Sequence, residues 1–418
     1  MKTFIITILS FGIALASSPV PLTWKSLLGS VTQDPKFKAN HERIQLMKTS
    51  PGFGIWNELE LRYEMDGFDL REHKLDVRIS PFGFGEGKAS QSNWQSRIQS
   101  NEIKQQKILG KSLRDRYRQG IWWIYKTKQL AFHRALRGVF DDRVQVHLSL
   151  STTERFDPED LVTSQQKLAE LDGEILSDLS EIEQCEARLH GIVPGWTVVE
   201  LDTLNQISAK EIRHFLDSLP QKIDSTYPEY RIALARLGMA ERKQQLEKSS
   251  RMNVVSYVNA GYAWQIPAAG KHDKTTPQQD LNAGFGLRVP IGDGRSQALL
   301  RSQIDVMDEK SALLETQSEI AERMNQLQRE VGSLVRQIAV QDSFQARVNA
   351  GALFTDYALR AGAEPLLLLK ARAAGLQTSW QSEKMGFDVV LAYLEILETV
   401  GVLSRDPTSN HLKIVKNP

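Results

Sequence analysis

The sequence predicts a mainly α-helical chain with a small β part, in which two very long helices accompany four strands. Two gaps of more than 70 residues lack proline, one after Pro81 and one after Pro290. Four other segments alternate apolar and polar residues, which is typical of strands. The same proline-bounded pattern occurs twice along the 418 residues. Together these observations indicate an elongated molecule built from two similar halves.

The N-terminus carries an export pattern. Lys2 is followed by the apolar run TFIITILSFGIALA, which ends in Ala14-Leu15-Ala16. A charged start, an apolar stretch and small residues before a cleavage point predict a secretory signal peptide over residues 1–16. The alternative, a single membrane anchor, would need a longer run to cross about 30 Å of hydrocarbon.

Composition excludes several classes of protein. A net charge of +1 gives no reason to expect a nucleic-acid partner. Cys185 is the only cysteine, so we expect no internal disulfide and no lipid at the cleavage point. The histidines lack metal-ligand spacing, and no nucleophile motif is present. We therefore expect no enzyme activity, no cofactor and no metal site.

Three pairs of prolines predict an internal repeat of about 200 residues. The partners are separated by 193, 209 and 207 residues, and they are Pro35 and Pro228, Pro81 and Pro290, and Pro158 and Pro365. Each unit reads as a helix, two strands, a long helix, a turn and a returning helix. The expected units are a first repeat over 17–210, a second over 211–404 and a tail over 405–418.

Each proline-free gap predicts a helix of about 60 residues, which is about 90 Å long. In the second gap the apolar residues recur at steps of 3, 4 and 7, which indicates coiled-coil packing. These residues are Ile304, Met307, Leu314, Ala321, Met324, Val331, Leu334 and Ile338. Such helices are too long for a compact core.

The four expected strands cover residues 55–65, 73–80, 254–264 and 281–289. Strict alternation fits a sheet with one apolar and one wet face, and it also fits transmembrane barrel strands. Four strands cannot close a barrel, but three chains would supply twelve. The charged positions on the polar face either line a pore or face solvent; they are Glu58, Glu60, Arg62, Glu64, Asp76, Arg78 and Arg288.

Several stretches resemble the TolC-type outer-membrane factor family, and the likeness spans nearly all of the mature chain. YPEYRIALAR (227–236) opens a helix, FGLRVPIGDGRSQALLRSQ (285–303) forms a strand-to-helix corner, and AGAEPLLLLKARAAGL (361–376) is similar to the family's second tip turn. The stretch FDVVLAYLEILETVGVL (387–403) is similar to the closing helix of the family.

The resemblance implies a homotrimer with a 12-stranded barrel in the outer membrane of a Gram-negative bacterium and a helical tunnel through the periplasm. It also implies a periplasmic adaptor (a membrane fusion protein) and an inner-membrane transporter of the RND or ABC type. Two tip turns are implied, at Arg155–Leu161 and Arg360–Leu366. The candidate tip and adaptor-contact residues are Arg155, Asp157, Asp160, Arg360, Glu364 and Leu366.

One stretch departs from the family. Many members carry acidic residues just past the second turn, whereas residues 366–369 here are leucines followed by Lys370. We therefore expect no acidic gate there, and the alternative is a charged constriction from Glu364, Asp157 or Asp160.

The expected function is an exit duct of a tripartite efflux pump or a type I secretion system. The alternative is a periplasmic coiled-coil adaptor or scaffold that never enters the membrane.

Overall fold

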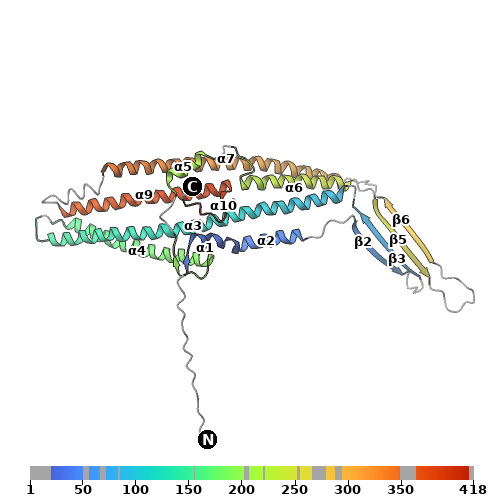
Figure 1. Cartoon of the computed structure of the whole chain (residues 1–418), viewed down its shortest axis with the longest axis horizontal. Coiled ribbons are helices and arrows are strands. Elements are labelled where there is room, and N and C mark those ends of the chain that lie inside the picture. Colours follow the sequence, from blue (N-terminus) through green and yellow to red (C-terminus); the bar gives the residue numbers. More distant parts are fainter. Residues whose placement is uncertain are drawn as a thin grey trace, which may run out of the picture.

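The computed structural model shows an elongated body of helices with a four-stranded sheet at one end (Figure 1). The described residues are 20–49, 56–65, 72–82, 85–154, 156–201, 207–219, 222–251, 255–265, 279–287, 294–348 and 364–413. Within them, no helix is long and apolar enough to cross a membrane.

Two long helices run along the body, α3 (Glu86–Leu150) and α7 (Gly294–Val348). They contain 65 and 55 residues, so each is roughly 80–100 Å long. The proline-free gaps predicted both. The shorter helices are α1 (Trp24–Gly29), the 3-10 helix η1 (Ser30–Gln33), α2 (Pro35–Lys48), α4 (Pro158–Ile192), α5 (Ala209–Asp217), α6 (Pro228–Arg251), α9 (Pro365–Val400) and α10 (Val402–Arg405).

Four of the prolines that mark the repeat, Pro35, Pro158, Pro228 and Pro365, are the first residues of the shorter helices, where the missing N–H costs no hydrogen bond, whereas Pro81 is the last residue of β3. Asp34 caps α2 by accepting a hydrogen bond of 2.9 Å from the Lys36 backbone N–H. Asp157 caps α4 in the same way, accepting from the Glu159 N–H at 3.0 Å. Local chemistry therefore defines where these helices begin.

The sheet contains β2 (Trp56–Met65), β3 (Glu72–Pro81), β5 (Val255–Gln265) and β6 (Gln279–Leu287), all antiparallel and in the order β2-β3-β5-β6. The two hairpins meet where β3 pairs with β5, although their strands lie far apart in the sequence. A separate parallel pair, β1 (Pro21–Leu22) with β4 (Val198–Val199), joins the first described residues to the helical body.

The element order occurs twice, as α2-β2-β3-α3-α4 and as α6-β5-β6-α7-α9. Helix α3 packs against α2 and α4, and also against α6 and α9, whereas α7 packs against α6 and α9. At the α6–α9 junction Gly401 has φ +79°, and an added Cβ there would lie 2.8 Å from Pro228 Cγ. Glycine at this position therefore allows the two helices to meet almost end to end.

The core lies near the middle of the body, where Leu27, Tyr117, Leu189, Ile212 and Ile396 are fully buried. The heptad pattern of α7 is buried only in part. Its second half packs inside the chain through residues such as Met324 and Val331. In contrast Ile304, Met307 and Leu314 are exposed, because at 3.6 residues per turn they lie on a different side of the helix from Met324 and Val331.

The first tip turn lies earlier than the sequence indicated. Residues 151–157 separate α3 from α4, and α4 already begins at Pro158. Asp160 and Leu161 are therefore helical rather than part of the turn, because proline and the Asp157 cap start the helix there. At the second turn α9 begins at Pro365, so Leu366 lies in its first turn. Residues 349–363 lie outside the described ranges.

Candidate functional site: the polar sheet face and the helical tip

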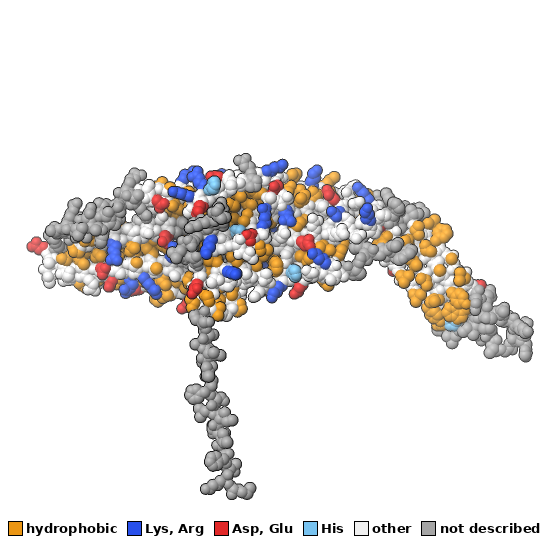
Figure 2. Space-filling view, viewed as in Figure 1, with side chains coloured by type: hydrophobic (Ala, Val, Ile, Leu, Met, Phe, Trp, Pro, Cys, Tyr) orange, Lys and Arg blue, Asp and Glu red, His pale blue; other side chains and the backbone are white. Residues whose placement is uncertain are grey.

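One face of the sheet is apolar across all four strands. The register aligns Leu59, Ile79, Val258 and Phe285 in one row. The next two rows are Leu61, Val77, Ala260 and Ala283, and Tyr63, Leu75, Tyr262 and Leu281. Phe285 is 72% exposed and Leu281 is 83% exposed. Figure 2 shows hydrophobic side chains gathered over this end of the molecule. An exposed apolar surface of this extent marks a contact with lipid or protein.

The opposite face carries the charged residues that alternation placed there. Arg62 Nε lies 2.9 Å from Glu60 Oε1, and Lys74 Nζ lies 2.9 Å from Asp76 Oδ2. The Arg78 guanidinium carbon lies 3.8 Å from the centre of the Tyr257 ring. Acidic and basic groups thus neutralise one another along the strands. The structure brings these predicted residues together on one polar face.

Glycines on β5 and β6 make room for polar side chains from neighbouring strands. Gly261 pairs with Asp76 on one side and Asn282 on the other, and an added Cβ would overlap the Oδ1 atoms of both. A Cβ at Gly284 would lie 2.6 Å from Asn259 Oδ1. The Asp76 side chain is consequently buried, although it stands on the polar face.

Of the remaining charged positions predicted for this face, the structure describes Glu58 but not Arg288. Glu58 is exposed near the start of β2, opposite Ser80 of β3. Arg288 lies outside the described residues. The sequence also missed Lys74, which forms ion pairs with Asp76 and Glu64. Its even-numbered position in the alternating stretch 73–80 was the available signal.

Charged side chains join three helices at the end of the body farthest from the sheet. Asp160 Oδ1 lies 3.2 Å from Arg143 Nη2 of α3, and its Oδ2 lies 3.3 Å from Lys370 Nζ of α9. Burial acts to raise the pKa of the Asp160 carboxyl, but Lys370 and Arg143 together hold that pKa below its usual value. Asp160 is thus the shared partner of two cations.

The other predicted tip residues have structural positions that the sequence left open. Asp157 caps α4, and Glu364 occupies the N-cap of α9 without a side-chain cap bond. Leu366 is half-buried in the first turn of α9. Arg155 and Arg360 lie outside the described residues. Sequence reasoning missed Arg143, because nothing local distinguishes it from other arginines of α3.

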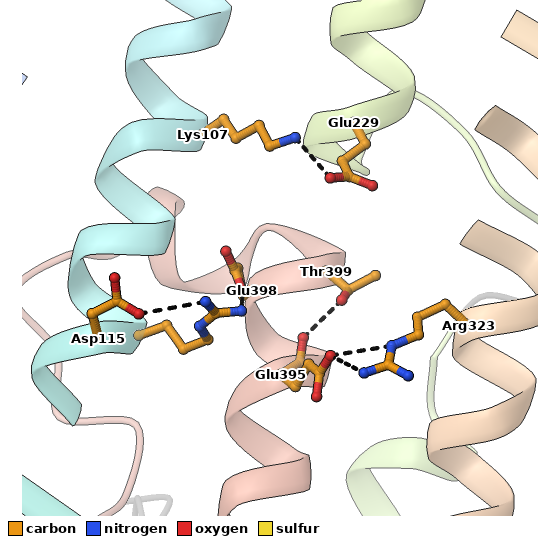
Figure 3. Close-up of polar contacts among 8 residues, drawn as sticks. Lys107, Asp115, Glu229, Arg323, Glu395, Glu398 and Thr399 are labelled. Carbon is orange, nitrogen blue, oxygen red and sulfur yellow. Dashed lines mark hydrogen bonds and ion pairs between the residues drawn. The ribbon is translucent and has the colours of Figure 1, made fainter. Parts of the chain in front are cut away.

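A third polar cluster surrounds the α6–α9 junction and joins four helices (Figure 3). Lys107 of α3 donates to Glu229 of α6 at 2.7 Å. Arg114 of α3 pairs with Glu398 of α9, and Arg323 of α7 pairs with Glu395 of α9. Burial raises the pKa of Glu398, and the Arg114 guanidinium opposes that shift.

No protein-family model matches the sequence, and no curated protein sequence matches it. Solved structures do match. CusC, described for transmembrane channel formation, has a TM-score of 0.64 at 14% identity, over 93% of this chain and 95% of that one. The outer membrane protein VceC of Vibrio cholerae has a TM-score of 0.62 at 11% identity, over 90% and 96%.

The open-state outer membrane channel MtrE of Neisseria gonorrhoeae matches with a TM-score of 0.57 at 9% identity, over 94% of this chain and 91% of that one. These matches span nearly the whole of each chain. The chain therefore has the TolC-type outer-membrane factor fold.

Proposed function

We propose that this protein is an outer-membrane exit duct, which conducts solute passively through a trimeric barrel and a helical tunnel. The observation that carries the proposal is the sheet with two unlike faces. Its apolar face suits lipid tails, because water-exposed leucine and phenylalanine side chains at this density are unfavourable. Its polar face suits a water-filled lumen. The charged residues Glu60, Arg62 and Arg78 would then line the passage.

The sheet edges support assembly of several chains. β2 and β6 are the outer strands of the four-stranded sheet. Edge backbone groups cannot remain unpaired in hydrocarbon, so a membrane sheet must close. Pairing β6 of one copy with β2 of the next would close a ring, and three copies would give the twelve strands that the sequence suggested.

The helical body would continue the passage into the periplasm. α3 and α7 extend away from the sheet for roughly 80–100 Å (Figure 1). At their far end we place the contact with a periplasmic adaptor, which would connect the duct to an RND or ABC transporter in the inner membrane. That machinery would be a tripartite efflux pump or a type I secretion system, and the energy would come from the transporter.

The first test is the state of the purified protein. We would express the full chain with its own N-terminal segment, separate inner membrane, outer membrane and periplasm, and measure mass by light scattering in detergent. The proposal predicts a detergent-bound trimer from the outer membrane that conducts ions in planar bilayers. A detergent-free monomer or dimer in the periplasm would contradict it and favour a coiled-coil scaffold.

A pair of substitutions would test the sheet faces. Phe285→Arg puts a charge on the apolar face, where a bilayer makes it unfavourable by about 2–4 kcal/mol near the midplane. Asn259→Arg puts the same charge on the polar face. We expect the first substitution to lower the yield of membrane-inserted trimer and the second to leave it near wild type. Equal yields would contradict the assigned faces.

A further inference from the structure

The two halves of the chain differ in how many neighbours their short helices have. In the second half, α6 and α9 lie between α3 and α7 and pack against both. In the first half, α2 and α4 pack against α3, and neither makes an extended contact with α7. The repeat therefore leaves one long-helix contact of α2 and α4 unmade.

Helix α7 has a matching free face. Residues at steps of 3, 4, 7 and 8 lie on the side opposite the one that packs on α6 and α9, and all are exposed: Leu300, Ile304, Met307, Leu314, Glu322, Arg329, Arg336 and Val340. We call this set the α7 outer face. Met307 is 70% exposed and Val340 is 68% exposed. The sheet-proximal half of this face is apolar, which predicts a helix partner.

Helices α2 and α4 expose a complementary surface on the side away from α3. It comprises Ala39, Leu46, Val162, Ala169, Gly173, Leu176, Glu183 and Ala187, here called the α2–α4 outer face. Leu46 is 74% exposed, and no described atom lies within 4 Å of a Cβ added at Gly173. Small residues along α4 permit close approach of another helix backbone.

We propose that the α7 outer face of one copy docks on the α2–α4 outer face of the next copy, with a register set by the internal repeat. The inference rests on the proposed trimeric duct, and it adds which residues meet. Its geometry comes from contacts already made inside one chain, where α3 meets α6 and α9. We shift the residue numbers of each contact by the separation between the two repeats. The shifted numbers then pair residues of α7 with residues of α2 and α4 in the next copy.

The α3–α6 contacts set the register near the sheet. Lys107 bonds Glu229, and Arg231 bonds Gln106. Adding 209 to the residue number on the long helix gives positions 316 and 315 of α7, and subtracting 193 from the number on the short helix gives positions 36 and 38 of α2. Position 316 is therefore opposite 36, and 315 is opposite 38. Because the helices are antiparallel, this register puts Leu314 opposite Ala39 of the next copy. One heptad away, Met307 is opposite Leu46.

The α3–α9 contacts set the register farther down. Lys128 Nζ lies 3.1 Å from Glu383, and the Phe132 and Trp380 rings stack at 5.4 Å. Moving these pairs by 209 forward and 207 back places positions 337 and 341 opposite 176 and 173. Val340 is therefore opposite Gly173 of the next copy. Two independent sets of contacts thus align apolar or small residues on both faces.

Charge agrees with the same register. In this register Arg329 of α7 lies opposite Glu183 of α4 in the next copy, and Glu322 lies within one helical turn of Arg188 of that copy. All four side chains are exposed, and no ion pair joins any of them to another described residue of its own chain. Opposite charges flanking an apolar seam are the pattern that selects partner and register in coiled coils.

Cysteine pairs would test the register in the full-length protein. In a Cys185→Ala background we would make two matched variants, Leu46→Cys with Met307→Cys and Gly173→Cys with Val340→Cys. The controls exchange partners: Leu46→Cys with Val340→Cys, and Gly173→Cys with Met307→Cys. Met307 and Val340 are about 50 Å apart along α7, whereas a disulfide requires Cα atoms within about 7 Å.

Mild oxidation in the membrane should convert the matched variants to covalent dimers and trimers, which a reductant reverses, and should leave the exchanged variants monomeric on denaturing gels. No larger ladder should form if three copies close a ring. Three outcomes within an intact trimer would overturn the proposed docking of the two outer faces: cross-links in the exchanged variants, equal cross-linking of all variants, or no cross-linking in any variant. The duct proposal would stand in each case. Monomers under non-denaturing conditions would contradict both proposals.

A charge exchange provides a second measurement. Arg329→Glu should lower the dissociation temperature of the assembly, because Glu183 would then face a like charge. Adding Glu183→Arg to that variant should restore the temperature. Restoration would support the pairing. If Glu183→Arg lowers the temperature of the Arg329→Glu variant further, these residues do not meet.

Discussion

Lys370 Nζ of α9 lies 3.3 Å from Asp160 Oδ2 of α4, so an ion pair joins the second turn of α9 to the first turn of α4, between residues that are 210 positions apart. Arg143 of α3 holds the other carboxylate oxygen. The tip therefore carries an ion pair between the two halves of the chain, at a place where we expected from the sequence no acidic gate or, as the alternative, a charged constriction.

Removing the ion pair between Lys370 and Asp160 should make the closed arrangement of the tip less stable. Both partners are partly exposed, so Lys370→Ala should weaken the α4–α9 contact by at most about 1 kcal/mol, which changes a closed-to-open ratio up to about fivefold. We expect more frequent open-channel events in planar bilayers. Lys167→Ala is the control, since Lys167 pairs with Glu170 within α4. Equal behaviour of the two variants would argue against a tip restraint.

Acid should weaken the same contact. The pKa of Asp160 in the folded protein lies below the usual 3.8, since Lys370 and Arg143 outweigh the effect of burial. A lowered carboxyl pKa contributes stability that is present above the unfolded-state pKa and is lost as pH falls through the folded-state value. Wild-type channels should therefore open more often below about pH 4. Asp160→Asn should be open more often already at pH 7 and should lose this acid response.

Within the α3–α4 hairpin, one buried pair should matter more than an exposed pair. His133 Nδ1 lies 2.6 Å from Asp178 Oδ2, and both side chains are buried. Asp178→Ala leaves a buried imidazole nitrogen without this hydrogen-bond partner and should destabilise the fold by about 1–3 kcal/mol. Asp172→Ala removes the exposed partner of Arg137 and should cost less than about 1 kcal/mol. Thermal unfolding in detergent would compare them, and similar midpoints would contradict this ranking.

A methyl group at Gly261 should disturb the polar sheet face. Its Cβ would overlap Asp76 and Asn282, so Gly261→Ala should destabilise the sheet by about 1–3 kcal/mol. Gly138→Ala is the matched control, because nothing lies within 4 Å of its added Cβ and alanine favours a helix by about 1 kcal/mol. The heat resistance of the assembled trimer would report both effects. If Asp76→Ala fails to lessen the effect of Gly261→Ala, the assigned clash is wrong.

Much of the fold was readable from local patterns. The stretch YPEYRIALAR predicted the start of a helix, and the structure begins α6 there, at Pro228. Alternation located all four strands, because side chains on a strand point to opposite faces in turn. The tip turn was misplaced by a few residues, since the sequence pattern did not show that Pro158 begins a helix whose first turn includes Asp160.

The sequence by itself determined the long helices, the strands and the polar and apolar faces of the sheet, because these follow from spacing within a few residues. Only the tertiary structure decided that Lys370 meets Asp160, that Gly261 admits Asp76 and that Ile304, Met307 and Leu314 remain uncovered. Those contacts join residues that are distant in the chain. Periodicity shows that a face needs a partner, and only the packing of whole helices shows which partner covers it.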